Sequence, residues 1–280
     1  MAPRIAVIIP TYNDGQLAKE AVASLRGSEE IELVVIDDGS TDPDALRALD
    51  ELRADHVNVV RQENQGLGPT RMNGLRLTSA PYIFPLDADD LAIPSSLSRM
   101  ASVLDQNPQA SFVWGDFEVF GSYDGFYRAP DRFDPYLLTW CNPYPVCSMY
   151  RRDALVAVRG WEVILQGQGY EDWDVWLKFA ESGHTGLYLG APAYRRRLLP
   201  GRMLSSARRG PVHRALLREI RSRHSDLYAR RRQLARESGY GPLQCFLLAT
   251  AFMARAYTPV WLESVAQRTM HRYMQIRRKS

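Results

Sequence analysis

Short apolar runs alternate with amphipathic segments along the first third of the chain. Arg4–Pro10 and Ile31–Asp37 are continuous β-branched runs, the kind that form strands buried on both faces of a sheet. Between them, Gln16–Leu25 carries apolar residues at helical spacing, so the three segments predict a β-α-β unit. The alternation then continues with a helix at Asp44–Leu52, a strand at Val57–Arg61, a helix from Pro69 and a strand at Tyr82–Leu86.

This alternation predicts an α/β fold, a Rossmann-like and mainly parallel sheet flanked by helices, whose ligands bind beyond the carboxyl ends of the strands. Past Pro94 the order changes. We expect a helix at Ser95–Gln106, a strand at Ser111–Phe120 and an irregular Tyr/Pro-rich region over residues 121–145. Strand-like segments follow at Val146–Tyr150 and at Leu187–Arg197, and the C-terminal part from Gly210 is helical.

The segment GYEDWDVWLKFAESG, residues 169–183, has helical spacing. Trp173, Trp176 and Leu177 fall on one apolar stripe, and Asp172 lies at the edge of that stripe. A carboxylate in the first turn beside apolar walls could act as a base. Acids are common at helix starts, however, and the segment taken alone favours that ordinary explanation. A solvated face is predicted for the other charged residues, Glu171, Asp174, Lys178 and Glu181.

Charge is distributed unevenly along the chain. Residues 1–204 hold 19 Lys and Arg against 28 Asp and Glu, a net charge of −9, whereas residues 205–280 hold 16 against 4, a net charge of +12. We therefore predict two parts, an acidic body of residues 1–204 and a basic helical C-terminal extension of residues 205–280. Such an extension is typical of a protein with an anionic partner, a membrane surface or nucleic acid.

Two segments of the C-terminal extension bear on that partner. Gly210–Arg236 is arginine-rich with a weak apolar stripe, and Leu243–Leu262 is strongly apolar but is interrupted by Arg255 and Pro259, which makes it a poor spanning helix. The extension could lie in a membrane interface beside anionic lipid, or pack on the body or on a second subunit. Nucleic-acid binding is disfavoured, because aromatic residues are not interleaved with the basic runs.

Cysteine usage and the first residues indicate a cytoplasmic setting. Cys141, Cys147 and Cys245 have spacings that fit neither a disulfide framework nor a zinc site, so we expect reduced thiols. The opening MAPRIAVIIPTYND runs directly into a strand without the pattern of a secretion signal. We expect a protein that is cytoplasmic, either free or peripheral on the inner face of the membrane.

Chemistry is expected just past the strand ends, which read PTYND, DDGSTD and LDADD. The last of these predicts a cation site. In an extended chain Asp87 and Asp89 project to the same side while Asp90 points away, and carboxylate oxygens suit a hard cation such as Mg²⁺ or Mn²⁺. The alternative is a solvated acidic turn.

The second strand end, with Asp38, indicates a nucleoside site, since PTYND lacks the G-x-G-x-x-G of dinucleotide-binding proteins. A carboxylate here could accept from a base or ribose, and Tyr12 offers a stacking face. A helix cap in residues 40–42 explains part of the same sequence. Residues 64–75, NQGLGPTRMNGL, lack the ending of a P-loop, and their Arg71 could reach a diphosphate or form a surface salt bridge.

Together these motifs resemble those of the family 2 glycosyltransferases, enzymes of the GT-A fold. The resemblance covers about residues 4 to 204 and depends on several motifs that occur in the right order. They are VIIPTYND, VVIDDGSTD, NQGLGPTRMNGL, DADD followed by Pro94, CSMYRRDAL with Gly160 and Trp161, and GYEDWDVWLKFAESG.

The resemblance implies an inverting transfer of a sugar from a nucleotide-sugar donor to an acceptor hydroxyl, with Mn²⁺ or Mg²⁺ as cofactor. It assigns Asp89 as the metal ligand and Asp172 as the base that deprotonates the acceptor. The acceptor would be a glycan, a lipid-linked sugar or another hydroxyl compound, in polysaccharide, glycolipid or cell-envelope glycan synthesis. The nucleotide sugar would contact the other matched residues, Pro10, Tyr12, Asp14, Asp38, Arg71 and Asp87.

One motif departs from the family pattern. Many relatives read Y-R-x-H-x-G-S-M after the last strand of the body, whereas residues 194–203 read YRRRLLPGRM, with Leu199 where a histidine often stands. A polar contact to the diphosphate or the metal would then be missing. One of the nearby arginines could replace the histidine contact through its charge: Arg195, Arg196, Arg197 or Arg202.

Two alternatives stay open at this stage. A nucleotidyl transferase would use a similar scaffold but would not need a base at Asp172. A catalytically silent nucleotide-sugar-binding or membrane-scaffold protein would account for Leu199, although the intact DADD motif and the Glu171-Asp172 pair argue against it.

Overall fold

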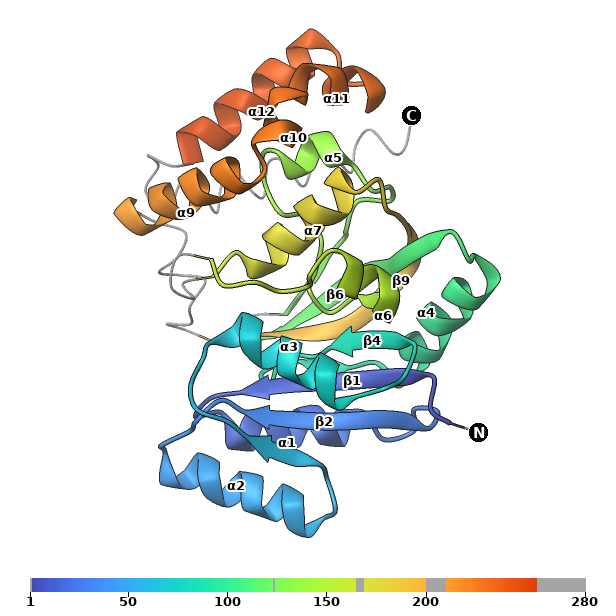
Figure 1. Cartoon of the computed structure of the whole chain (residues 1–280), viewed down its shortest axis with the longest axis vertical. Coiled ribbons are helices and arrows are strands. Elements are labelled where there is room, and N and C mark those ends of the chain that lie inside the picture. The colour runs from blue at the N-terminus through green and yellow to red at the C-terminus, as the bar shows by residue number, and fades with distance from the viewer. Residues whose placement is uncertain (1, 123, 165–168, 200–209, 256–280) are drawn as a thin grey trace.

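The computed structural model describes residues 2–122, 124–164, 169–199 and 210–255 of the 280-residue chain. Helices cover both faces of one sheet (Figure 1). The strands are β1 Ile5–Thr11, β2 Ile31–Asp37, β3 Val59–Arg61, β4 Tyr82–Pro85, β5 Leu91–Ala92, β6 Ala110–Gly121, β7 Gly125–Tyr127, β8 Met149–Arg151 and β9 Thr185–Leu198. The helices are α1 Gly15–Ser24, α2 Pro43–Ala54, α3 Leu67–Leu77, α4 Pro94–Gln106, α5 Pro135–Leu138, α6 Arg152–Ala157, α7 Glu171–Glu181, α9 Gly210–Arg223, α10 Ser225–Ala229, α11 Arg231–Glu237 and α12 Pro242–Arg255.

The strands of the sheet follow the order β3-β2-β1-β4-β8-β6-β9-β5, and β7 pairs with β6. β1 runs parallel to both of its neighbours, so that Ile5 pairs with Ile31 on one side and with Tyr82 on the other. In the second half, β6 is parallel to β9 over a long ladder, whereas β8 is antiparallel to both β4 and β6. The predicted α/β fold with a mainly parallel sheet is confirmed, and the carboxyl ends of β1, β2 and β4 meet at one edge.

Alternate residues of β1 enter two different cores. Ile5, Val7 and Ile9 pack with α1, α2 and α4 on one face of the sheet, whereas Ala6 and Ile8 pack with α3 and α7 on the other. All seven residues of the strand are buried, because both faces of the sheet are covered. This double coverage explains why β1 reads as a continuous apolar run and not as an alternation.

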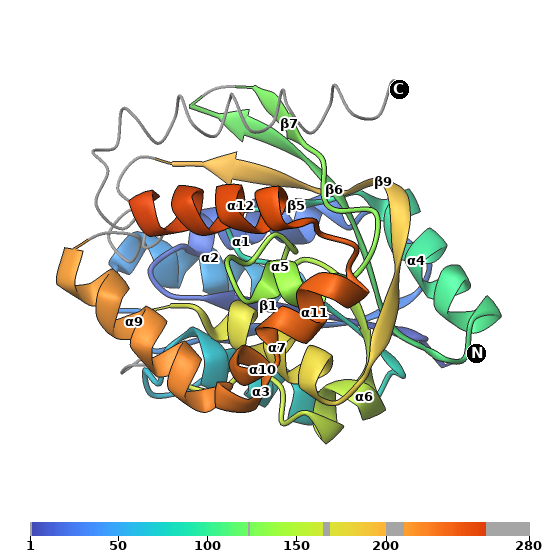
Figure 2. The same cartoon turned by 90° about the horizontal axis from the view of Figure 1, so that it is seen from above.

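The described part of the C-terminal extension packs on the body. Helices α9, α10 and α11 lie over α7 and α5 (Figures 1 and 2). Leu216, Ile220 and Leu227 are fully buried and belong to the same core as Trp173 of α7. The apolar stripe of the arginine-rich segment therefore packs on the body, one of the arrangements expected from the sequence. The predicted boundary after residue 204 and the apolar residues 256–262 lie outside the described residues.

The polar face predicted for α7 is wrong at two positions. Glu171 is 7% exposed and Asp174 is fully buried. Arg71 of α3 reaches Glu171, and His224, which precedes α10, hydrogen bonds with Asp174. Helical spacing shows which residues share a face, but not which other elements cover that face.

Four short elements differ from the sequence expectation. The region 121–145, predicted to be irregular, contains β7 and also α5, whose N-cap Asp134 accepts from the backbone N–H of Tyr136 at 2.9 Å. β5 and α6 were not predicted, since two and six residues are too few to show a period.

Two other expectations concern the cysteines and the membrane. The three cysteines are free thiols, as predicted. Among the described helices, none combines the length and the apolar character that a bilayer crossing requires.

Candidate active site

The ends of β1 and β2 lie side by side at the edge where ligands were expected. The backbone N–H of Asp38 donates to the carbonyl of Thr11 at 2.9 Å, which joins the two strand ends. Tyr12 is 48% exposed just past β1, and Pro10 is buried within the strand. Asp14 is the N-cap residue of α1 and is partly buried. The structure thus brings these predicted residues to one end of the sheet.

Asp38 holds a neighbouring loop. Its carboxylate is 4% exposed and accepts from the backbone N–H groups of Gln65 and Gly66, at 2.9 and 2.8 Å, and from the side-chain amide of Gln62 at 2.7 Å. The adjacent Asp37 is fully buried. A carboxylate has about four acceptor positions, so Asp38 keeps capacity for one further donor.

The acids after β4 form a turn. The backbone N–H of Asp90 donates to the carbonyl of Asp87 at 2.9 Å, and one carboxylate oxygen each from Asp87, Asp89 and Asp90 lie within 4.8 Å of one another. Asp90 is 4% exposed and accepts from the backbone N–H of Arg197. The expectation that Asp90 points away is therefore wrong, because the chain turns here and is not extended.

This acidic cluster fits a divalent cation. Burial, together with the nearby charges of Asp87 and Asp89, raises the pKa of Asp90 well above its usual range. A cation would offset the mutual repulsion of these carboxylates, and oxygen donors are the ligands that Mg²⁺ and Mn²⁺ prefer. Asp87 and Asp89 are each partly exposed, so their oxygens are accessible from the strand-end edge.

Arg71 is the centre of a second charged cluster. Its side chain is fully buried and pairs with Asp87 at 2.6 Å, with Asp172 at 2.7 Å and with Glu171 at 3.4 Å. Burial lowers the pKa of Arg71, but the three carboxylates more than offset that effect, so the pKa lies above its ordinary value. The surface salt bridge considered from the sequence is wrong. Arg71 instead links the acidic turn after β4 to the start of α7.

The two acids at the start of α7 differ in environment. Burial, then the charge of Asp172, raises the pKa of Glu171 to about 7, although Arg71 acts in the opposite direction. The pKa of Asp172 is also raised, mainly by burial, and Arg71 limits that rise. The Asp172 side chain is 28% exposed and that of Glu171 is 10% exposed. Of the two, Asp172 is therefore better placed to contact a ligand.

One arginine of β9 faces the acids. Burial lowers the pKa of Arg196, but the nearby Tyr194, Asp90 and Asp87 more than offset this effect, so the pKa lies above its ordinary value. Of its neighbours along β9, Arg195 pairs with Glu118, whereas Arg197 pairs with Glu20 and also donates its Nε–H to the backbone carbonyl of Asp89 at 3.0 Å. Arg202 lies outside the described residues. Among the arginines considered for the missing histidine contact, Arg196 and Arg197 both lie beside the acidic cluster, and the charge of Arg197 is already paired with Glu20.

Sequence reasoning missed three members of this region. Asp90 joins the cluster, Glu171 is part of the Arg71 network, and the fully buried thiol of Cys147 lies 3.9 Å from an Asp90 oxygen. The doubled acid in DADD was a signal for Asp90. No local pattern could reveal the other two, because their partners are 57 and 100 residues away in the sequence.

The chemistry of this edge combines acids, one buried cation and an aromatic face. The acidic turn could hold a cation, Asp172 could accept a proton, and Tyr12 with Asp38 could hold a planar group. The amino-acid sequence from residue 6 to residue 159 matches the model of the family described as glycosyl transferase family 2. The chain belongs to glycosyl transferase family 2.

Relatives of this glycosyltransferase include a second glycosyltransferase and a protein of succinoglycan synthesis. It is 26% identical over 204 residues to EpsE of Bacillus subtilis (strain 168), whose name places it among the glycosyltransferases, and the match covers 69% of this chain and 72% of EpsE. It is also 40% identical over 102 residues to the succinoglycan biosynthesis protein ExoU of Rhizobium meliloti (strain 1021). That match covers 35% of this chain and 30% of ExoU.

A solved structure confirms the predicted GT-A fold. Residues 1–349 of TarS from S. aureus, in complex with UDP-GlcNAc, superpose on the glycosyltransferase with a TM-score of 0.64 at 20% identity, covering 80% of this chain and 66% of that one. At this identity the likeness concerns the fold. The roles assigned to single residues of the active site stay predictions.

Proposed function

We propose that this glycosyltransferase transfers a sugar from a nucleotide-sugar donor to an acceptor hydroxyl in a single displacement with inversion. The observation that carries the proposal is the arrangement around Arg71, with Asp87 of the strand-end edge on one side and the partly exposed Asp172 on the other. The name of EpsE supports glycosyl transfer, and the name of ExoU supports a role in polysaccharide, glycolipid or cell-envelope glycan synthesis. The TarS complex supports a nucleotide-sugar donor.

The donor would lie across the ends of β1, β2 and β4. Tyr12 would stack on the base, Asp38 would accept from the base or ribose, and Asp87 would lie nearer the ribose. Pro10 and Asp14 flank this position. Arg71 would act on the donor mainly by fixing the carboxylate of Asp87, because its own side chain is fully buried.

A divalent cation would be held by Asp89, with Asp87 and Asp90 beside it. Bound there, Mn²⁺ or Mg²⁺ would supply positive charge near the departing diphosphate. Arg196 would add a fixed positive charge from β9, which would compensate for Leu199 in place of the histidine. Asp90, held by the backbone N–H of Arg197, would orient the turn.

The acceptor hydroxyl would transfer its proton to Asp172 while its oxygen attacks the sugar carbon from the face opposite the diphosphate. The raised pKa of Asp172 favours this step, since a base works best when its pKa lies nearer the working pH. Arg71, at 2.7 Å, fixes the orientation of that carboxylate. A nucleotidyl transferase would have no use for this arrangement.

A thermal-shift panel of nucleotide sugars, with and without Mn²⁺, tests the proposal. A donor at about 100 times its Kd stabilises the folded protein by about 2.7 kcal/mol, which is several degrees. We expect one nucleotide class to stabilise the protein more with Mn²⁺, and Asp89→Ala to remove that difference. Asp50→Ala, an exposed acid on α2, is the control. The absence of any stabilisation would reject the donor assignment, and binding without turnover would favour the silent protein.

We further propose that the enzyme works in the cytoplasm at the inner face of the membrane. On α12 the side chains of Leu243, Phe246 and Leu247 are 69%, 63% and 49% exposed at helical spacing. Exposed arginines lie on α9 and α11, which suits a bilayer with anionic lipid. The apolar stripe would enter the interface while the arginines contact phosphates.

Sedimentation with vesicles of anionic or neutral phospholipid tests this location. Deleting the whole extension would expose core residues, so point variants are preferable. Leu243→Asn combined with Phe246→Asn should reduce binding to anionic vesicles. The matched control combines Leu77→Asn and Val156→Asn, which are 49% and 54% exposed on other helices. Equal sedimentation of the two double variants would contradict the proposed membrane contact.

A further inference from the structure

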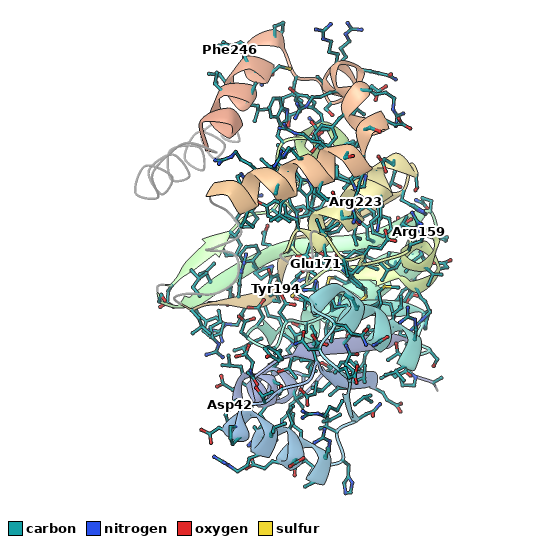
Figure 3. All side chains as sticks on the ribbon, turned by 60° about the vertical axis from the view of Figure 1, so that its left-hand side comes forward. Asp42, Arg159, Glu171, Tyr194, Arg223 and Phe246 are labelled. Carbon is teal, nitrogen blue, oxygen red and sulfur yellow. The ribbon has the colours of Figure 1, made fainter. Side chains whose placement is uncertain are left out.

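A cavity of about 610 Å³ lies beside α3. Its walls come from α3, from the loop at residues 159–163 and from the end of α9. Arg223 and Arg159, which both line it, lie on the same side of the molecule in Figure 3. The volume falls in the range of about 300–1,000 Å³ that small-molecule sites occupy, enough for a few sugar units. None of the roles proposed above uses this cavity.

The lining of the cavity is positively charged. Three arginines, Arg76, Arg159 and Arg223, face it together with a single acid, Glu162. Glu162 is paired with Lys178 at 2.6 Å, so its charge is largely offset already. We refer to this cavity as the arginine groove. The excess of guanidinium groups favours an anionic occupant, because these groups bind carboxylate and phosphate through paired hydrogen bonds.

Two of the three arginines have donors available for such an occupant. Arg159 is 4.0 Å from Glu162 and its side chain is 79% exposed, so this ion pair is weak. Arg76 donates to the neutral side chain of Asn73, and no acidic partner is present for it within the described ranges. Arg223 is more constrained, since it pairs with Glu219 at 2.8 Å.

The arginine groove adjoins the active site through two residues. Gln65 lines the groove and donates its backbone N–H to Asp38. Trp161 also lines it, and the guanidinium of Arg71, which pairs with Asp172, lies over the Trp161 ring, 5.7 Å from its centroid.

We propose that the arginine groove binds the acidic part of the acceptor, a glycan chain that carries carboxylate or phosphate groups a few sugar units from the reacting hydroxyl. The inference depends on the proposed glycosyl transfer and narrows its acceptor to an anionic glycan. Arg76 and Arg159 bind the charged groups, while Met72 and Val163 contact the apolar faces of the chain. The reacting hydroxyl then reaches Asp172 from the same side as Trp161.

Calorimetric titration of the full chain with hexasaccharides tests the proposal. The probes are an oligogalacturonate, which carries carboxylates, a phosphorylated malto-oligosaccharide and neutral maltohexaose. We expect at least one anionic probe to bind, more weakly at high salt, and the neutral probe to bind far more weakly. Which anionic probe binds better identifies the carboxylate or the phosphate as the recognised group.

The variant Arg76→Gln with Arg159→Gln should weaken binding of that anionic probe about tenfold, the equivalent of one lost charge-assisted hydrogen bond. Arg47→Gln is a matched control, because Arg47 is also an exposed arginine that pairs with an acid three residues away. Equal affinity for the anionic and neutral probes, absence of binding by both anionic probes, or unchanged affinity in the double variant would each overturn the proposal.

The same proteins should be tested with nucleotide sugars by thermal shift, which separates this inference from the proposed function. Stabilisation by a nucleotide sugar without binding of either anionic probe would remove the acidic acceptor alone. Binding of an anionic probe that depends on Arg76 and Arg159, without stabilisation by any nucleotide sugar, would support the groove and reject the donor assignment.

Discussion

Arg71 shows how a residue can be recognised in the sequence and still be misplaced. The motif around it indicated either a diphosphate contact or a surface salt bridge, but the side chain is fully buried among three carboxylates. Asp87 is 16 residues away from it in the sequence, and Glu171 and Asp172 are 100 and 101 residues away. No local pattern encodes contacts of this length. The sequence could therefore supply the residue types of the site but not their pairing.

Replacing Arg71 should destabilise the fold more than it would at a surface position. In Arg71→Met, three buried or partly buried acids lose their counter-charge, and breaking such a network costs about 3–5 kcal/mol. Arg71→Lys should lose less, because the charge stays while the paired geometry is lost. Urea unfolding measures both. Arg47→Met, on the exposed face of α2, should change stability by less than about 0.5 kcal/mol. A variant Arg71→Met as stable as the wild type would contradict a stabilising network.

Asp172 and Glu171 form a natural pair for testing the base. Asp172→Asn should lower kcat by about 100- to 10,000-fold and leave donor binding intact, because the amide can still accept from Arg71 but cannot take a proton. Glu171→Gln should have a smaller effect on kcat, since this side chain is less exposed. Initial rates and nucleotide-sugar thermal shifts on both variants decide the matter. Full activity of Asp172→Asn would show that Asp172 is not the base. A larger loss of activity in Glu171→Gln would assign the base to Glu171 instead.

At the scale of elements, the sequence predicted the buried parallel half well. β2 begins and ends at the predicted residues, and α1 is displaced by one residue, because continuous apolar runs and helical stripes are strong local signals. The polar side of α7 was misjudged for a different reason. Its covering helices come from more than 30 residues later in the chain, and the periodicity of one helix carries no information about them.

The contact between α1 and α2 gives a test at this scale. A Cβ added at Gly15 would lie 2.1 Å from the carbonyl oxygen of Ala45, a backbone atom of α2. Alanine is favoured over glycine in a helix by about 1 kcal/mol, but forcing two helices apart costs about 1–3 kcal/mol, so the clash should dominate. We expect Gly15→Ala to unfold at lower urea concentration than the wild type.

The control for this substitution is Gly241→Ala, where the nearest atom to the added Cβ is 3.7 Å away. Gly241→Ala should unfold at the wild-type urea concentration or slightly above it. If Gly15→Ala were equally neutral, the packing of α1 on α2 would be looser than the structure shows.

At the scale of the whole molecule, the basic extension neutralises part of an acidic body. His224 is the clearest link, because its two ring nitrogens lie 3.1 Å from Asp174 and 2.9 Å from Glu181, both on α7. Lys178 pairs with Asp174, and Arg223 of α9 approaches the same carboxylate at 4.0 Å. The extension thus covers the helix that carries Asp172. The composition showed the charge asymmetry, but only the fold shows that the two charges meet.

The stability of this link should depend on pH. Burial lowers the pKa of His224, but its hydrogen bonds to Asp174 and Glu181 more than offset that effect and raise the pKa above its ordinary value near 6.5. The stabilising charge is therefore fully present below about pH 6.5 and is lost as the pH rises through the raised pKa. The difference in Tm between the wild type and His224→Gln should be larger at pH 6 than at pH 8, by about 2 °C or more.

The comparison with His224→Gln is needed because Glu171 and Asp172 also have raised pKa values, which lower stability over part of the same pH range. Their contribution is common to both proteins and disappears from the difference. A Tm difference that stays constant from pH 6 to pH 8 would show that His224 is not charged in the folded protein.

The long separation between Arg71 and its acidic partners also has a consequence in time. A ribosome adds about 5–20 residues per second, so Asp172 is made roughly 5–20 s after Arg71 and Asp87. We expect the parallel half around β1 to fold on the ribosome before α7 exists, and α9 and α10 to cover α7 last. During that interval the nascent chain would hold the proposed donor side without the proposed base. Catalytic competence would arrive late and in one step, when the last helices dock.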